Sequence, residues 1–185
     1  MKPIERKEIV DFETYEDTRE VFRAEVMAAK QVRRVQVDPV FTFLFENRLT
    51  KRYQIQEMIR AERLVKEQEI QHEIDTYNGL LGGPGELACT LLIEIDDPAE
   101  RSIKLKAWLE LPEHIYLMLE DGSRVRALFD AGQRGRDRLS SVQYLKFPVK
   151  GQVPVAVGID LPQLQSETKL SQEQRQALAE DLADD

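Results

Sequence analysis

Residues 82–95, Gly-Gly-Pro-Gly-Glu-Leu-Ala-Cys-Thr-Leu-Leu-Ile-Glu-Ile, decide the fold class of this chain. The glycines and Pro84 predict a sharp turn, and the segment after them alternates in the way that a half-buried β-strand does. Its other face is mixed in polarity, which indicates a sheet that is only partly covered. The continuous apolar face of this predicted strand consists of Leu87, Cys89, Leu91, Ile93 and Ile95.

Amphipathic helices are predicted on both sides of this strand, because apolar residues recur there at steps of three and four. Asp97 followed by Pro98 suits an N-cap and a first helical position, so a helix is expected to begin there. Ser171 and Gln174 have the spacing of a capping box at the start of a last helix. The predicted helices cover about residues 17–34, 48–64, 67–78, 97–109 and 171–182.

Apolar alternation between turn residues predicts further strands, and Asp121-Gly122 is typical of a hairpin turn. We therefore expect an α+β fold, with a largely antiparallel sheet of about seven strands and helices packed on one face. Residues 1–160 are expected to form a single domain, and residues 161–185 a linker and a C-terminal helix with an acidic end. The other predicted strands cover about residues 35–37, 40–45, 115–120, 123–129, 142–149 and 155–159.

Composition limits the class of protein. The chain has 34 acidic and 26 basic side chains among 185 residues, a formal net charge of −8. No apolar run reaches the length of about 18 residues that spans a bilayer, and the first residues lack the apolar segment of a signal peptide. Cys89 is the single cysteine, which excludes an internal disulfide and a cysteine-cluster metal site. The composition predicts a soluble, cytoplasmic protein.

Polar residues gather in two clusters that border apolar strands, and these are the candidate ligand- or partner-binding residues. If such groups face inward, they must bond to one another or to a ligand. We expect the two clusters to share one site, although a polar network that fixes the strand–helix junction would explain the first without a ligand. The first cluster is Glu46, Asn47, Arg48, Gln54, Glu57, Arg60 and Glu62. The second is Asp130, Gln133, Arg138 and Gln143.

An ordered set of short motifs runs through the chain: Phe45-Glu-Asn-Arg48, Gln54-Ile-Gln-Glu-Met58, Arg60-Ala-Glu62, Tyr77-Asn78, Gly83-Pro-Gly-Glu86, Phe129-Asp130, Gly132-Gln133, Asp137-Arg138, Ser141-Val-Gln-Tyr144 and Phe147-Pro148. Together they resemble the bacterial family named domain of unknown function 3501, over about residues 8–160. The resemblance brings no catalytic residues. It implies a rubrerythrin-like protein and an iron–sulphur protein, related to heterodisulfide reductase subunits, as neighbours in the genome and possible partners.

The leading hypothesis is a non-enzymatic accessory or binding protein of a bacterial redox system. The sequence shows no haem, flavin or cluster ligands, so no cofactor of its own is expected and a redox cofactor would belong to a partner. Nucleic acid is not expected as a partner of an acidic chain without an aromatic-interleaved RNA motif. The protein is not expected to associate with a membrane. A homodimer is one of the assemblies left open.

Two alternatives stay open. A hydrolase or transferase would use Glu57 or Glu62 as general base, with Arg60 or Arg138 holding an anionic substrate. A metal protein would use Glu69-Ile-Gln-His72, whose spacing places both side chains on one helix face. That half-motif would need a second copy of the chain to complete a site, and a solvated helix surface is the preferred interpretation.

Overall fold

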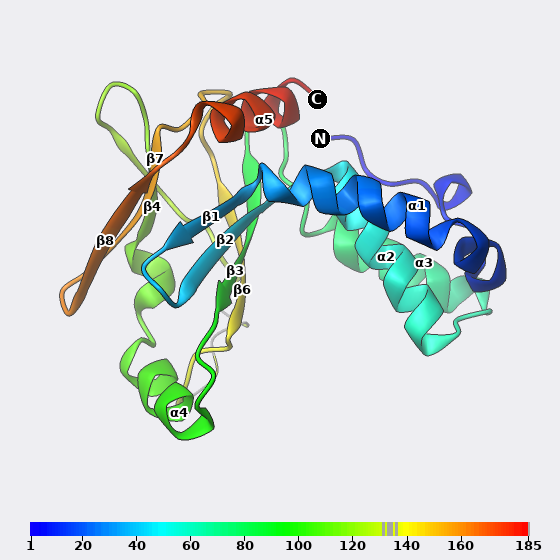
Figure 1. Ribbon diagram of the computed structural model, residues 1–185, viewed down its shortest axis with the longest axis horizontal. Coiled ribbons are helices and arrows are strands. Elements are labelled where there is room, and N and C mark those ends of the chain that lie inside the picture. The colour runs from blue at the N-terminus through cyan, green and yellow to red at the C-terminus, as the bar shows by residue number, and fades with distance from the viewer. Residues whose placement is uncertain (131, 133–134, 136, 185) are drawn as a thin grey trace.

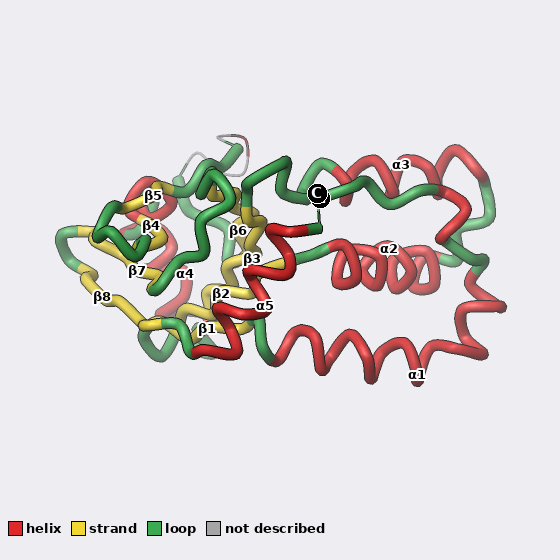
Figure 2. Tube along the Cα trace, turned by 90° about the horizontal axis from the view of Figure 1, so that it is seen from above, coloured by secondary structure: helices red, strands yellow, loops and turns green. Residues whose placement is uncertain are grey.

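Three of the predicted helices form an arm that projects from a β-sandwich, so the molecule is L-shaped (Figure 1). This computed structural model describes residues 1–185 except 131, 133–134, 136 and 185. The arm consists of α1 (Phe12–Gln31), α2 (Arg48–Glu62) and α3 (Glu67–Asn78), preceded by a short 3-10 helix, η1 (Arg6–Glu8). Figure 2 shows the three helices side by side, with α2 between the other two.

The arm has an apolar core of its own. Ile55 and Ile59 of α2 meet Ile70 and Ile74 of α3, and all four are buried. Helix α1 begins earlier than the pattern predicts, because Asp11 is its N-cap and accepts hydrogen bonds from the backbone of the first turn.

The described residues form eight strands in two antiparallel sheets of four. The prediction of an α+β fold built largely from antiparallel strands is confirmed. The expected single sheet is instead divided in two, and each sheet covers the apolar face of the other. Sheet A runs in the order β1 (Arg34–Val37), β2 (Phe41–Glu46), β3 (Leu87–Ile93) and β6 (Val142–Phe147). Sheet B runs in the order β5 (Arg124–Arg126), β4 (Ile115–Met118), β7 (Ala156–Leu161) and β8 (Leu164–Lys169).

Helices α4 (Pro98–Ala107) and α5 (Gln172–Ala183) lie at opposite ends of the sandwich (Figure 1). Trp108, directly after α4, packs on Phe41 of β2 with 5.2 Å between ring centroids. Leu178 of α5 is fully buried in the core between the sheets. The helices therefore do not share one sheet face, because the second sheet supplies the cover that the prediction assigned to helices.

Two predicted segments differ from the structure. Residues 161–169, expected as a linker, contain β8, which pairs with β7 over six residues of each strand. The strand expected over residues 123–129 is limited to β5, after which Leu128 forms a separate bridge to β6. A second 3-10 helix, η2 (Leu111–His114), leads into β4. In the part of the chain that the structure describes, no helix has the length and apolar character needed to cross a membrane.

Candidate functional site

The junction between the sandwich and the arm is built where β2 ends and α2 begins. Asn47 is the N-cap of α2: its side chain accepts a hydrogen bond from the Thr50 backbone N–H, and the Thr50 hydroxyl accepts one from the Asn47 N–H. This reciprocal capping box satisfies two backbone donors at the helix start. It fixes the direction in which the arm leaves the sheet.

A buried ion pair lies beneath this cap. The Glu46 carboxylate accepts hydrogen bonds from Lys51 Nζ at 3.0 Å, Thr50 Oγ1 at 2.6 Å and Thr90 Oγ1 at 2.7 Å. Burial alone would raise the pKa of Glu46, but the Lys51 charge and the two hydroxyl donors outweigh it and hold that pKa below its ordinary value. Glu46 is therefore an ionised structural anchor that ties α2 to β2 and β3.

Two tyrosines separate this pair from the corner of the L. Lys51 Nζ lies 5.5 Å from the ring centroid of Tyr144 on β6 and 6.0 Å from that of Tyr77 on α3. It also donates to Gln54 Oε1 at 3.2 Å. Burial, with the nearby Tyr144, raises the pKa of Tyr77 to about 12. The faces of both rings lie within reach of the Lys51 ammonium group, an arrangement that allows cation–π attraction.

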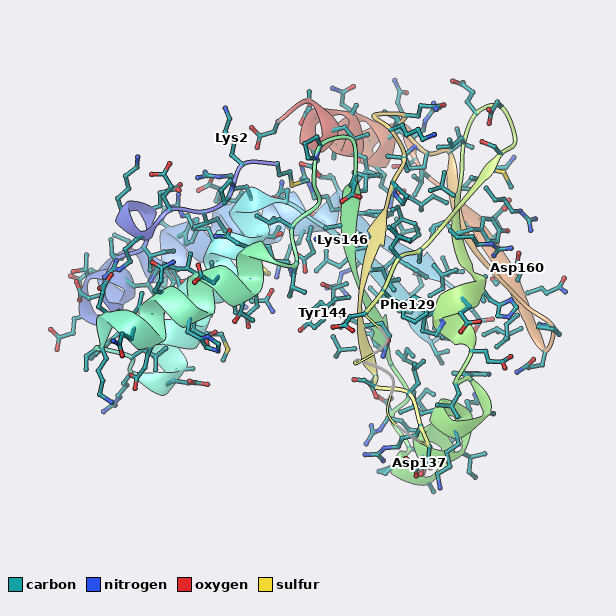
Figure 3. The ribbon with its side chains drawn as sticks, turned by 180° about the vertical axis from the view of Figure 1, so that it is seen from behind. Lys2, Phe129, Asp137, Tyr144, Lys146 and Asp160 are labelled. Carbon is teal, nitrogen blue, oxygen red and sulfur yellow. The ribbon has the colours of Figure 1, made fainter. Side chains whose placement is uncertain are left out.

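A pocket of about 270 Å³ opens beside Tyr144, in the corner between the arm and sheet A. Figure 3 shows Tyr144 and Lys146 on the side of β6 that faces the arm, with Phe129 on the neighbouring segment. Two backbone hydrogen bonds between Leu128 and Lys146, of 2.7 and 2.9 Å, hold that segment against β6. We call this the corner pocket; its described lining is Gly79, Leu80, Leu128, Phe129, Asp130, Tyr144, Leu145 and Lys146.

The corner pocket combines apolar walls with opposite charges. Leu128 is 52% exposed, which is high for a leucine beside a sheet, and Phe129 and Leu80 are half-buried. Lys146 and Asp130 supply one positive and one negative side chain. Such a site can hold an apolar group and pair with charges on either side of it.

The structure brings four of the candidate residues toward this corner. Glu46 and Gln54 bond to Lys51, Asn47 caps the helix above them, and Asp130 lines the pocket. Lys51, to which Glu46 and Gln54 bond, lies 5.5 Å from the ring centroid of Tyr144, and Tyr144 lines the corner pocket together with Asp130.

The remaining residues of the first cluster face other parts of the arm. The Glu57 carboxylate accepts hydrogen bonds from Arg19 at 2.8 and 2.9 Å and from Tyr15 at 2.7 Å. Arg60 pairs with Glu16 on α1, and Arg48 pairs with Glu8 in the N-terminal segment. Glu62 is exposed. These pairs join α1 and the N-terminal segment to α2 and leave the corner pocket untouched.

The rest of the second cluster is dispersed. Gln143 points into the sandwich, is fully buried, and donates to the Ser140 carbonyl at 2.9 Å, while its Oε1 has no partner among the described atoms. Arg138 is exposed and lines a separate cavity beside Arg101 of α4. Gln133 lies outside the described residues.

Sequence reasoning missed Lys51, Tyr77, Tyr144 and Lys146. Alternation along β6 carried the missing signal: residues 143, 145 and 147 face the core, so Tyr144 and Lys146 face outward toward the arm. Choosing Gln143 as a site residue selected the wrong side of this strand for the corner, because neighbouring side chains on a strand point to opposite faces.

The two residues of the metal hypothesis lie on the exposed surface of α3. His72 is exposed, and Glu69 pairs with Lys66 at 2.9 Å. Among the described residues, no three His, Cys, Asp or Glu side chains are grouped as a metal site. Burial raises the pKa of the Cys89 thiol well above its ordinary value, which makes this thiol a poor nucleophile.

A further polar cluster lies on the outer face of sheet B. Asp160 accepts two hydrogen bonds from Arg126, of 2.8 and 2.7 Å, and one from Arg124 of 2.9 Å. Arg124 also stacks over Tyr116, 4.2 Å from its ring centroid, and Tyr116 donates to Glu167 at 2.8 Å. Because these groups satisfy one another across neighbouring strands, we assign them to sheet stability.

Comparison with known proteins identifies relatives but no activity. Residues 3–182 match the family model described as "Protein of unknown function (DUF3501)". A crystal structure of a novel protein of unknown function from Burkholderia pseudomallei K96243 is similar throughout: the TM-score is 0.90 at 27% sequence identity, over 98% of this chain and 100% of that one. No curated protein matches the chain.

Proposed function

Because this chain belongs to the DUF3501 family of proteins of unknown function, we propose its role from the geometry of the corner pocket. The role is that of a non-enzymatic accessory protein that binds a partner protein of a redox system. The observation that carries the binding role is an apolar pocket with charged edges, beside the hydrogen-bonded junction between the arm and sheet A.

The size of the pocket favours a protein partner. Its volume of about 270 Å³ lies below the range of roughly 300–1,000 Å³ that is usual for small-molecule sites. A single large apolar side chain suits it better, with Phe129 and Leu128 as walls. Interface hot spots have this arrangement, in which a buried anchor is surrounded by polar groups that exclude water. Lys146 and Asp130 would pair with charges next to the anchor.

The state of the candidate carboxylates supports binding over general-base catalysis. A general base at neutral pH needs a raised carboxyl pKa. Hydrogen bonds from Arg19 and Tyr15 instead hold the pKa of Glu57 below its ordinary value. Glu46 is likewise ionised and enclosed by its partners. Glu57 therefore lacks the protonation behaviour that the hydrolase or transferase hypothesis requires of its general base, and Glu62, the other candidate base, is exposed and does not line the corner pocket.

The redox association rests on the family resemblance, which implies a rubrerythrin-like protein and an iron–sulphur protein as partners. Either one, purified, serves as the binding partner in a test by biolayer interferometry. We expect Leu128→Asp to raise Kd at least tenfold, because it places a carboxylate in the apolar pocket. Lys146→Glu tests the charged edge independently and should also weaken binding. Both side chains are partly exposed, so both variants should fold.

Val65→Asp is the matched control, because Val65 is an apolar residue, 73% exposed, in the loop between α2 and α3. It should bind as the unmodified protein does. Equal weakening by Val65→Asp and Leu128→Asp would refute the corner pocket as the interface. Absence of binding to both partners at tens of micromolar would refute the redox association.

A further inference from the structure

We propose that a groove along the outer side of the arm docks a basic amphipathic helix of a protein partner. The groove lies between α1, α2 and the N-terminal segment and has a volume of about 390 Å³. Figure 2 shows α1 and α3 on opposite sides of α2, and the lining of this arm groove shares no residue with that of the corner pocket. Its decisive residues are Val10, Asp17, Val21, Phe22, Glu25 and Arg52.

Phe22, Val10 and Val21 form the apolar part of the arm groove, and the Arg52 guanidinium stacks over the Phe22 ring. Val21 is 79% exposed and Val10 is 39% exposed. Helix α1 buries Tyr15 and Val26, which leaves Val21 on another side of the helix. The Phe22 side chain is held in place at the bottom of the groove, because its ring packs edge-on against Tyr15 and Tyr53 with centroid distances of 6.3 and 5.9 Å.

Acidic side chains flank this apolar surface. Asp17 and Glu25 lie one helical turn before and after Val21, and both are exposed. The Arg52 guanidinium stacks 4.6 Å from the centre of the Phe22 ring, and its positive charge is outnumbered in the lining by Glu8, Asp17 and Glu25. A helix with an apolar face and flanking lysines or arginines complements this surface. The net charge of −8 would also steer a basic partner toward the molecule.

The same charges argue against a second copy of the chain as the occupant. In a symmetric antiparallel pairing of α1 centred on Val21, Asp17 of one copy meets Glu25 of the other. Both side chains are acidic, and like charges placed together at an interface are unfavourable. A basic helix from a different protein meets no such repulsion.

Fluorescence anisotropy with a designed peptide tests the proposal directly. The probe is a fluorescein-labelled amphipathic helix with a leucine face and a lysine face, and its counterpart carries glutamate in place of every lysine. We expect the lysine peptide to bind and Val21→Lys to weaken it at least tenfold. Asp17→Asn combined with Glu25→Gln should weaken it as well and reduce the salt dependence of binding. These side chains are exposed, so thermal unfolding should change little.

Val65→Lys is the matched control, with a similarly exposed valine outside the groove. It should bind the lysine peptide as the unmodified protein does. Equal weakening by Val65→Lys, or equal binding of the glutamate peptide, would overturn the proposal. Self-association of the unmodified chain in sedimentation, abolished by Val21→Lys, would also overturn it, because the occupant would then be a second copy. None of these outcomes depends on whether the corner pocket binds its own partner.

Discussion

Arg33 and Asp181 form a buried bidentate ion pair between residues 148 positions apart. Arg33 Nε lies 2.7 Å from Asp181 Oδ2, and Arg33 Nη2 lies 2.8 Å from Oδ1. Asn47 Nδ2 also donates to Asp181 at 3.0 Å. Because Asn47 caps α2, one carboxylate of α5 holds the end of α1, the start of α2 and the C-terminal helix together.

Removing that carboxylate should be strongly destabilising. Asp181→Ala leaves Arg33 buried without its partner, and breaking a buried pair in this way costs about 3 kcal/mol or more. Urea unfolding monitored by circular dichroism measures the change. Glu180→Ala, at the exposed neighbouring position, should alter the free energy of unfolding by less than about 0.5 kcal/mol. A similar loss in both variants would show that the buried ion pair is not the source of the stabilisation.

Stability should depend on pH through Glu57. Hydrogen bonds from Arg19 hold the pKa of Glu57 in the folded protein below its ordinary value of 4.5. Folding therefore favours the ionised form, so the contribution is complete above about pH 4.5 and is lost as pH falls through the lowered pKa. Glu57→Gln should cost about 1 to 2 kcal/mol at neutral pH and progressively less below pH 4.5.

Urea midpoints measured between pH 3 and pH 7, at intervals of about half a unit, give this dependence. Glu62→Gln is the control, because Glu62 lies exposed at the end of the same helix. Its difference from the unmodified protein should stay small at every pH. A constant difference for Glu57→Gln across the range would contradict the role of ionised Glu57.

Cys89 should react only when the chain unfolds. Its side chain is buried on β3, and burial raises the pKa of the thiol, so few thiolates form at neutral pH. With a large excess of the disulfide reagent 5,5′-dithiobis(2-nitrobenzoate) at pH 8, labelling should follow the rate of opening rather than reagent concentration. Denatured protein should react at once with one equivalent. Rapid labelling of the folded protein, in proportion to reagent, would contradict the burial.

Local chemistry explains which elements the sequence could predict. Asp97 accepts a hydrogen bond from the Glu100 N–H at 2.7 Å, and Ser171 with Gln174 forms the expected capping box. These signals involve residues three apart, so they need no knowledge of the rest of the chain. The alternation of apolar residues over positions 87–95 is an equally local signal, and the strand that it predicts is confirmed as β3.

Pairings between distant segments explain what the sequence could not show. Strand β8 has the sequence Leu-Gln-Ser-Glu-Thr-Lys, which lacks apolar alternation and resembles a linker. It is a strand because β7 offers it a free edge. The same limit applies to the polar faces of α2: Glu57 faces α1 because Arg19 lies opposite, whereas Lys51 faces the sheet because Glu46 and Thr90 lie there.

The Glu46–Lys51 pair should show strong coupling in a double-mutant cycle. Lys51→Met leaves the buried Glu46 carboxylate without its cation, and Glu46→Gln leaves the buried Lys51 ammonium without its anion. Each single change should cost about 3 to 5 kcal/mol, whereas the combined change removes both charges and should cost less than the sum by at least about 2 kcal/mol. Urea unfolding of the four proteins measures the coupling. Additive losses would mean that Thr50 and Thr90, rather than Lys51, carry the stabilisation of Glu46, and the junction would then owe its rigidity to hydroxyl hydrogen bonds.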